Sequence, residues 1–259
     1  MVPAVPVTLC PNLDAGSGGG NGSGGRYLSS GSATLPFQIY QDSGYSQPWG
    51  STSFLVFGST PTITITPDSS GKASTTRTLY LQMSATSTAV PGTYSSAFAN
   101  ENFFYGLNLL SCAGITIGVA TVPASFTFSV TVISNCLVTA TNMGFGSVGL
   151  ISSAINASNQ LNVQCTSSTP YSLSLNNGLY GSSPGARQMA SGANRVSYAI
   201  YMDNGRTQLW GDVSQGLSYV QSATGNGGTQ SYTGYGQVPA QTGAAPGSYS
   251  DTIVATATY

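Results

Sequence analysis

The chain has 259 residues, of which only 5% are charged, and it carries a net charge of −1 and no histidine. The lack of histidine excludes Ser-His-Asp and Cys-His catalysis and the commonest metal ligands. Six scattered basic residues form no stripe that could bind nucleic acid. Seven dispersed acidic residues give no assembled acid/base pair. We therefore expect no enzyme, no cofactor and no metal site.

Short alternating runs recur along the chain between clusters of Gly, Pro, Asn and Ser, and no long 3.6-residue pattern appears. This pattern predicts an antiparallel all-β protein with almost no helix. The first alternating run, Val5 to Leu9, is followed by the glycine-rich run Gly16–Gly25. A phosphate-binding loop would need a helix after it, so we interpret this run as a flexible connection between strands.

Two pairs of segments show an internal repeat. Residues 26–50 align without a gap to residues 187–211, and residues 78–94 align without a gap to residues 233–249. The repeat predicts two tandem domains of one fold, 1–133 and 134–259. Asp42 and Asp203 occupy equivalent places and are interpreted as turn residues.

The two copies differ at their beginnings. Pro170–Leu173 resembles Pro6–Leu9, so residues 136–169 have no counterpart in the first copy. We therefore expect the given sequence to start inside the first domain, which then lacks its first strands. Met1–Pro6 is too short and too rich in proline for a signal segment, so an export signal was removed or lies upstream.

The stretch from Ala124 to Ile133, at the junction of the two copies, has the strongest strand pattern of the chain. Apolar side chains alternate there with Thr and Ser, which is typical of a strand with one buried face. We expect this strand to close the first domain in cis and to leave the second domain one strand short. The residues that would face the first core are Phe126, Phe128, Val130 and Val132.

Four cysteines without CxxC spacing indicate disulfides and an oxidising compartment. Of three pairings we favour Cys10–Cys112 with Cys136–Cys165, because each bond then closes a loop within one domain.

The second domain resembles the spore coat protein U domain, the domain of subunits in archaic, Csu-type chaperone–usher pili. The resemblance depends on several short motifs: Cys136–Ala140, Phe145-Gly146, Leu161–Thr166, Arg187–Met189, Tyr198–Asp203, Trp210-Gly211 and Pro246–Ile253. It implies two immunoglobulin-like β-sandwiches, of which the second is incomplete. A periplasmic chaperone and then the next pilin subunit would each donate a strand, and an outer-membrane usher would export the protein to the cell surface. The acceptor groove would be bordered by the last strand, with Ile253, Ala255, Ala257 and Tyr259.

Two tandem domains of this kind resemble a pilus tip adhesin, which would mediate attachment to an abiotic or host surface and biofilm formation. Residues 101–112 form an apolar stretch absent from the second copy, which either continues a core strand or forms an exposed adhesive tip. Two alternative functions stay open, a structural pilin or coat subunit without specific adhesion and a carbohydrate-binding sandwich. The candidate adhesive residues are Phe103, Phe104, Tyr105, Leu107, Leu109, Leu110 and Tyr45.

Overall fold

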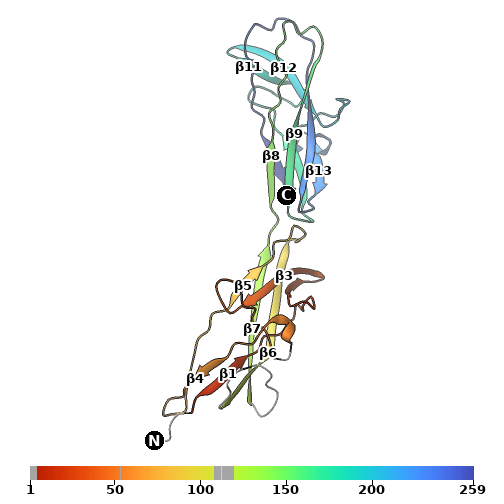
Figure 1. The fold of residues 1–259 in the computed structure, drawn as a ribbon. Coiled ribbons are helices and arrows are strands. Elements are labelled where there is room, and N and C mark those ends of the chain that lie inside the picture. Colours follow the sequence, from red (N-terminus) through yellow and green to blue (C-terminus); the bar gives the residue numbers. More distant parts are fainter. Residues whose placement is uncertain (1–4, 53, 108–111, 113–119) are drawn as a thin grey trace. The chain divides into compact units, whose positions relative to one another are not determined.

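The computed structural model describes most of the chain, namely residues 5–52, 54–107, 112 and 120–259. The chain divides into two units, Met1–Val132 and Ile133–Tyr259, each with its own strands (Figure 1). In the described residues, strands make up the regular structure except for three single-turn 3-10 helices, and no helix there is long and apolar enough to cross a membrane. The prediction of an all-β protein is therefore confirmed. The three helices are η1 (Leu55–Phe57), η2 (Val213–Gln215) and η3 (Leu217–Tyr219).

The first unit forms one continuous antiparallel sheet in the order β4-β1-β6-β2-β3-β5, with β7 on the other edge of β6. The long strand β6 joins the two parts of this sheet, because its end pairs with β1 and its beginning makes the single pair Ser95–Ser29 with β2. The glycine-rich run lies between β1 and β2, as an inter-strand connection. The strands are β1 (Val7–Pro11), β2 (Arg26–Ser30), β3 (Ala33–Tyr40), β4 (Ile63–Ile65), β5 (Tyr80–Met83), β6 (Gly92–Leu107) and β7 (Ala120–Val132).

The second unit is a sandwich of two antiparallel sheets, with strand orders β11-β12-β14-β9-β8 and β13-β10-β15. Alternating apolar residues of β9, β10 and β12 fill the space between the sheets around the buried Trp210. The strands are β8 (Cys136–Ala140), β9 (Ile155–Cys165), β10 (Pro170–Leu175), β11 (Arg187–Ser191), β12 (Asn194–Tyr201), β13 (Gln221–Thr224), β14 (Thr229–Val238) and β15 (Ala255–Thr258).

Disulfides join Cys10 to Cys112 in the first unit and Cys136 to Cys165 in the second. The second bond crosslinks β8 and β9 at a directly opposed pair of residues. This is the pairing that the sequence favoured, and each bond stays within one unit.

The repeat in the sequence is also a repeat of strand register. Ile39 pairs with Leu81 in the first unit, as Ile200 pairs with Gly236 in the second. Strands β2, β3 and β5 therefore correspond to β11, β12 and β14. The described part of the first unit contains no counterpart of β8 or β9.

One detail of the sequence alignment was wrong by two residues. The repeat-equivalent arginines Arg26 and Arg187 donate hydrogen bonds to the carbonyl oxygens of Leu13 and Leu175 respectively. Leu13 therefore corresponds to Leu175, and Leu9 corresponds to Tyr171 rather than to Leu173. A shift of two residues keeps every side chain on its original face of the strand, which is why the apolar pattern alone did not expose the error.

Candidate functional site

Both sheets of the second unit end on the same side of the sandwich. Strand β8 pairs only with β9, and β15 pairs only with β10, among the strands that the structure describes. β8 and β15 lie near each other but share no ladder of hydrogen bonds. The backbone groups on the facing edges of these two strands are therefore available to a further strand.

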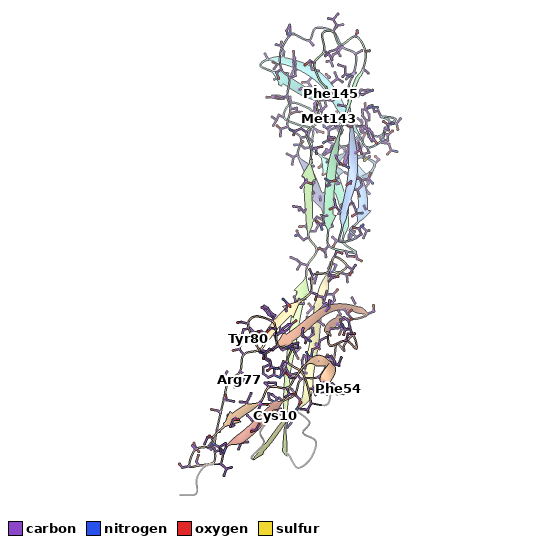
Figure 2. The ribbon with its side chains drawn as sticks, viewed as in Figure 1. Cys10, Phe54, Arg77, Tyr80, Met143 and Phe145 are labelled. Carbon is purple, nitrogen blue, oxygen red and sulfur yellow. A yellow bond between two sulfur atoms is a disulfide. The ribbon has the colours of Figure 1, made fainter. Side chains whose placement is uncertain are left out.

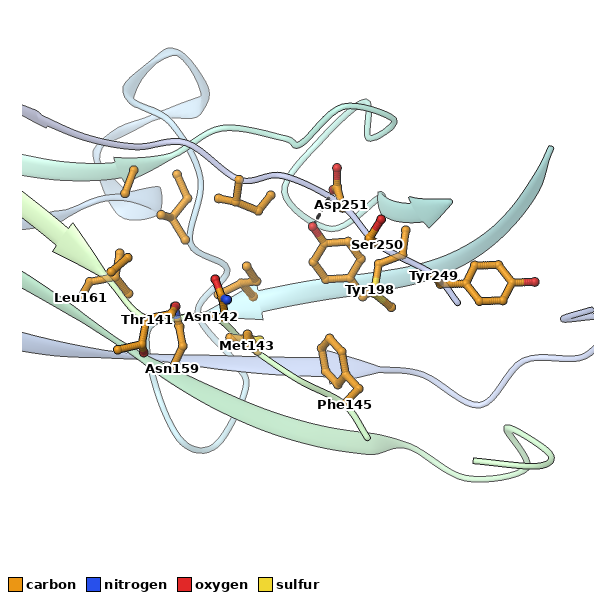
Figure 3. A pocket seen from close by; sticks show the side chains of 16 residues that line it. Thr141, Asn142, Met143, Phe145, Asn159, Leu161, Tyr198, Tyr249, Ser250 and Asp251 are labelled. Carbon is orange, nitrogen blue, oxygen red and sulfur yellow. Dashed lines mark hydrogen bonds between the residues drawn. The ribbon is translucent and has the colours of Figure 1, made fainter. Parts of the chain in front are cut away.

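A groove opens between these two edges, where the chain leaves β8 and approaches β15. One cavity of about 600 Å³ is lined by Met143, Phe145, Ile253 and Ala255 among others (Figure 3). A second cavity of about 780 Å³ shares Met143 and Phe145 and extends past Ile151. The two cavities share part of their lining and together form one groove, which is lined by polar and apolar side chains beside the open edges of β8 and β15.

The floor of the groove depends on a glycine in β14. A Cβ atom added at Gly236 would collide with the sulfur of Met143, and it would lie 2.9 Å from the ring of Phe145. The Phe145 ring also makes an edge contact with Tyr198, with 6.2 Å between the ring centroids. Met143 and Phe145 therefore lie directly over β14, and a side chain at position 236 would displace them.

The four residues predicted to border the groove on its last strand are not equivalent. Ile253 and Ala255 line the groove and pack against the core, and Ala257 is half-buried in β15. Tyr259 is 56% exposed and donates a hydrogen bond from its hydroxyl to Oδ1 of Asn135 at 3.3 Å. The alternate residues between them are exposed, as expected for a strand with one apolar face, namely Thr252, Val254, Thr256 and Thr258.

A partly buried network of hydrogen bonds around Asp251 fixes the chain just before β15. Asp251 Oδ2 accepts a 2.6 Å hydrogen bond from the Tyr198 hydroxyl (Figure 3). Asp251 Oδ1 accepts bonds from the backbone N–H groups of Leu179 and Thr252. Burial, together with this bond to Asp251, raises the pKa of Tyr198, so its hydroxyl stays protonated and keeps donating. One wall of the groove is thereby tied to β12.

The buried Arg187 supports the same wall through hydrogen bonds to the end of β10, the strand that pairs with β15. Its guanidinium donates to the carbonyl oxygens of Leu175, Asn176, Pro184 and Trp210. Burial lowers the pKa of Arg187 to about 10, an effect opposed by the nearby carboxylate of Asp251, so the side chain remains charged at neutral pH.

In the first unit the corresponding edge is already paired, because β6 lies beside β1 as β15 lies beside β10, and its other edge pairs with β7. β7 runs antiparallel to β6 from Gly92–Val132 to Phe98–Phe126, and after an irregularity it pairs again from Glu101–Ala124 onward. The Phe126 ring stacks on Phe98 with 5.0 Å between centroids. All four predicted closing residues pack against the core cluster of this unit, namely Phe126, Phe128, Val130 and Val132.

The predicted adhesive residues are only partly within the described structure. The backbone of Phe103, Phe104, Tyr105 and Leu107 lies in β6, while their side chains, and Leu109 and Leu110 entirely, fall outside the described part. Tyr45 is 41% exposed and contacts Tyr40 edge-on, with 5.5 Å between centroids.

Sequence reasoning missed three further apolar residues at the surface. Phe54, Leu55 and Val56 are 51%, 75% and 48% exposed, and they lie in and before η1 (Phe54 is labelled in Figure 2). Phe54 and Val56 also line a cavity of about 590 Å³ against the glycine-rich loop. The signal that could have found them is the apolar run Phe54–Phe57, which stands between polar residues without any alternation.

Comparisons with known proteins identify the family and the fold. A family model described as the Spore Coat Protein U domain matches residues 6–99 and 122–256. Among solved structures, the chain is similar to a chain of the CsuC-CsuE chaperone-tip adhesion subunit pre-assembly complex from archaic chaperone-usher Csu pili of Acinetobacter baumannii. The sequence identity is 16%, the TM-score is 0.57, and the similarity covers 99% of this chain and 84% of that chain. This likeness is one of fold. A comparison with curated proteins gave no match.

Proposed function

Since the chain belongs to the spore coat protein U domain family, we propose that it is the adhesive tip subunit of an archaic chaperone–usher pilus. One observation carries the proposal: the same strand edge is paired with β7 in the first unit and lies open in the second. A subunit with a closed first unit needs no strand there, whereas its second unit must receive one from another polypeptide. This arrangement suits the last position of a fibre, where the first unit has no further subunit to accept.

The groove suits a donor strand with apolar residues at alternate positions. The backbone edges of β8 and β15 would pair with such a strand, and its apolar side chains would enter the cavities beside Met143, Phe145 and Ile253. β7 is the template for this strand, because it supplies alternating Phe and Val residues to the equivalent place in the first unit.

The need to fill this groove also indicates which proteins this subunit would bind. A periplasmic chaperone would fill it first and keep the apolar cavities from aggregating, and the next pilin subunit would replace the chaperone at an outer-membrane usher. The similar solved complex contains a chaperone and a tip subunit, and it supports the chaperone step by analogy of fold. The route leads through the periplasm, where the disulfides form, to the cell surface.

Attachment and biofilm formation would depend on the first unit. Exposed apolar patches are rare on soluble domains unless they are used, and Phe54, Leu55 and Val56 give such a patch. Tyr45 and the apolar segment 103–110 remain further candidates. The target is an apolar abiotic surface or a host surface, and we propose no catalytic role.

Strand acceptance can be tested with the full chain extended at its C-terminus. A flexible linker and a second copy of residues 120–133 would follow Tyr259, so that a β7-like strand can reach the groove. We expect this fusion to stay monomeric without a chaperone and to melt at a higher temperature than the unextended chain. The matched control carries serine at the positions of Phe126 and Phe128 in the extension only. Equal melting of the fusion and this control would refute strand acceptance.

Adhesion needs a separate test, because it could fail while strand acceptance holds. Leu55→Ser with Phe54→Ser should reduce binding of pilus-bearing cells to polystyrene without reducing the amount of pili. Leu217→Ser, at a residue that is 78% exposed in the second unit, is the matched control. Unchanged adhesion of the double variant would remove Phe54 and Leu55 from the proposed adhesive surface, and Phe103→Ser with Tyr105→Ser then tests the other segment.

A further inference from the structure

The cavity of about 590 Å³ between η1 and the glycine-rich run opens on the outer face of β6, and we call it the glycine cleft. Its large apolar side chains all come from one segment, as Phe54, Val56 and Phe57. The rest of its described lining is mostly glycine and alanine, from the glycine-rich run and from Ala97 and Ala99 of β6. Large side chains and exposed backbone thus meet in one apolar cleft.

Hydrogen bonds to β6 and β2 hold the glycine-rich run in place. The backbone N–H of Ser17 donates to the carbonyl oxygen of Ala97 at 2.8 Å, and the N–H of Ala97 donates to the Ser17 hydroxyl at 2.8 Å. The N–H of Tyr27 donates to the carbonyl oxygen of Gly19 at 2.9 Å. This wall of the cleft is therefore formed before any ligand binds, which lowers the entropy lost on binding.

The run packs closely against η1 because it lacks side chains. A Cβ atom added at Gly20 would lie 2.8 Å from the Phe57 ring, and one added at Gly24 would collide with the carbonyl oxygen of Val56. Phe57 is 7% exposed, and the guanidinium carbon of the buried Arg26 lies 4.7 Å from its ring centroid. The Phe57 ring is thus fixed on two sides.

The Phe54 ring, in contrast, is accessible to a ligand. It lies 6.5 Å from the Phe57 ring between centroids and is 51% exposed (Figure 2). An exposed ring beside a wall of small residues lets a flat molecule contact an aromatic face and approach the backbone closely.

The same face is also open in the second unit. Ala97 and Ala99 correspond to Thr252 and Val254 in the sequence repeat, and both of these residues are exposed, Val254 by 53%. The second unit contains β8 and β9. Strands in the positions of β8 and β9 therefore leave this face uncovered.

Size and charge indicate the chemistry of the ligand. Sites for small molecules usually have a volume of about 300–1,000 Å³, so the glycine cleft has room for two fused rings. Asp14 is the only charged residue among the described residues that line the cleft. An anionic ligand would find no cation there and would lie beside a carboxylate.

We propose that the glycine cleft binds a flat, uncharged aromatic group of one or two rings. The cleft shares Phe54 and Val56 with the proposed adhesive surface, but it is a discrete site that a soluble molecule can fill. The proposal therefore holds whether or not the chain acts at a pilus tip.

Calorimetric titration of the full chain with three matched compounds at neutral pH tests the proposal. Naphthol is flat and uncharged, decahydronaphthol has the same carbon skeleton without the flat rings, and naphthoate is flat but anionic. We expect naphthol to bind roughly tenfold more tightly than either of the other two. Equal affinity for naphthol and decahydronaphthol would overturn the proposal, as would tighter binding of naphthoate or no binding of naphthol up to its solubility limit.

Variants locate the site. Ala99→Leu should weaken naphthol binding roughly tenfold or more, because the larger side chain occupies the cleft from an exposed position. Phe54→Ala, at an exposed residue, should weaken it roughly fivefold by removing the aromatic neighbour. Thr93→Leu is the matched control, since Thr93 is exposed on the same face of β6 and does not line the cleft. Unchanged naphthol binding in both Ala99→Leu and Phe54→Ala, or an equal loss in Thr93→Leu, would place the ligand elsewhere and refute the assignment.

Discussion

The closing strand of the first unit leads to a quantitative prediction about Phe128. Its ring makes edge contacts with Phe37 at 6.3 Å, Phe98 at 5.6 Å and Phe126 at 5.2 Å between centroids. A fully buried Phe→Ala change costs about 3–5 kcal/mol, and each aromatic pair adds about 0.5–1.5 kcal/mol. Because Phe128 is only half-buried, we expect Phe128→Ala to lower the free energy of unfolding of the first unit by about 2–4 kcal/mol.

Each unit contains a single buried tryptophan, so the two units can be followed separately. Trp210→Phe leaves Trp49 to report the first unit, and Trp49→Phe leaves Trp210 to report the second. In urea, the Trp49 midpoint should fall by roughly 1–2 M, since m is about 1–3 kcal/mol/M, and the Trp210 midpoint should stay unchanged. Thr127→Ala, which faces outward on the same strand, is the control. An equal fall of the Trp210 midpoint, or no fall of the Trp49 midpoint, would contradict closure in cis by β7.

Three more predictions concern the stability of the two units. Arg187→Met should lower the free energy of unfolding of the second unit by about 2–4 kcal/mol, measured by the Trp210 signal, because it leaves several buried carbonyl oxygens without a donor. The backbone N–H of Gln208 is the main cause that holds the pKa of Asp203 below the ordinary value of 3.8. The ionised Asp203 carboxylate therefore stabilises the folded state fully above pH 3.8, and this stabilisation is lost as the pH falls through the lower folded-state pKa. Asp203→Asn should therefore lower the melting temperature at pH 7 and have little effect at low pH. Reduction should destabilise the first unit more than the second in urea titrations, by about 4.7 against 3.6 kcal/mol in the chain-entropy model, because the Cys10–Cys112 loop spans 102 residues and the Cys136–Cys165 loop spans 29.

The features that the sequence predicted are those with a local or periodic signal. Alternation of apolar and polar residues predicted the strand that became β7, and the gapless repeat predicted the matching registers around Ile39 and Ile200. Asp42 and Asp203 each accept bonds from the backbone four and five residues ahead, which is turn chemistry contained in the local sequence.

The features that the sequence did not predict depend on neighbours far along the chain. Met143 and Phe145 lie over the groove floor because β14 has a glycine at position 236, and no pattern near Phe145 encodes that contact. The burial of Arg26 and Arg187 also goes against composition, since an isolated arginine in a polar sequence is normally exposed.

The edges of β6 and β15 differ most in whether the strand that pairs with them belongs to the same chain. β7 belongs to the same chain as β6, so its pairing involves no loss of translational and rotational freedom, and the first unit is closed at any protein concentration. A strand that enters the groove beside β15 must associate, so the stability of the second unit should rise with the logarithm of the donor concentration. Titration of the donor peptide 120–133 should therefore raise the Trp210 midpoint steadily and leave the Trp49 midpoint fixed. Were both midpoints to rise together, the peptide would be binding β6 as well, and β7 would be a dissociable strand rather than a permanent part of the first unit.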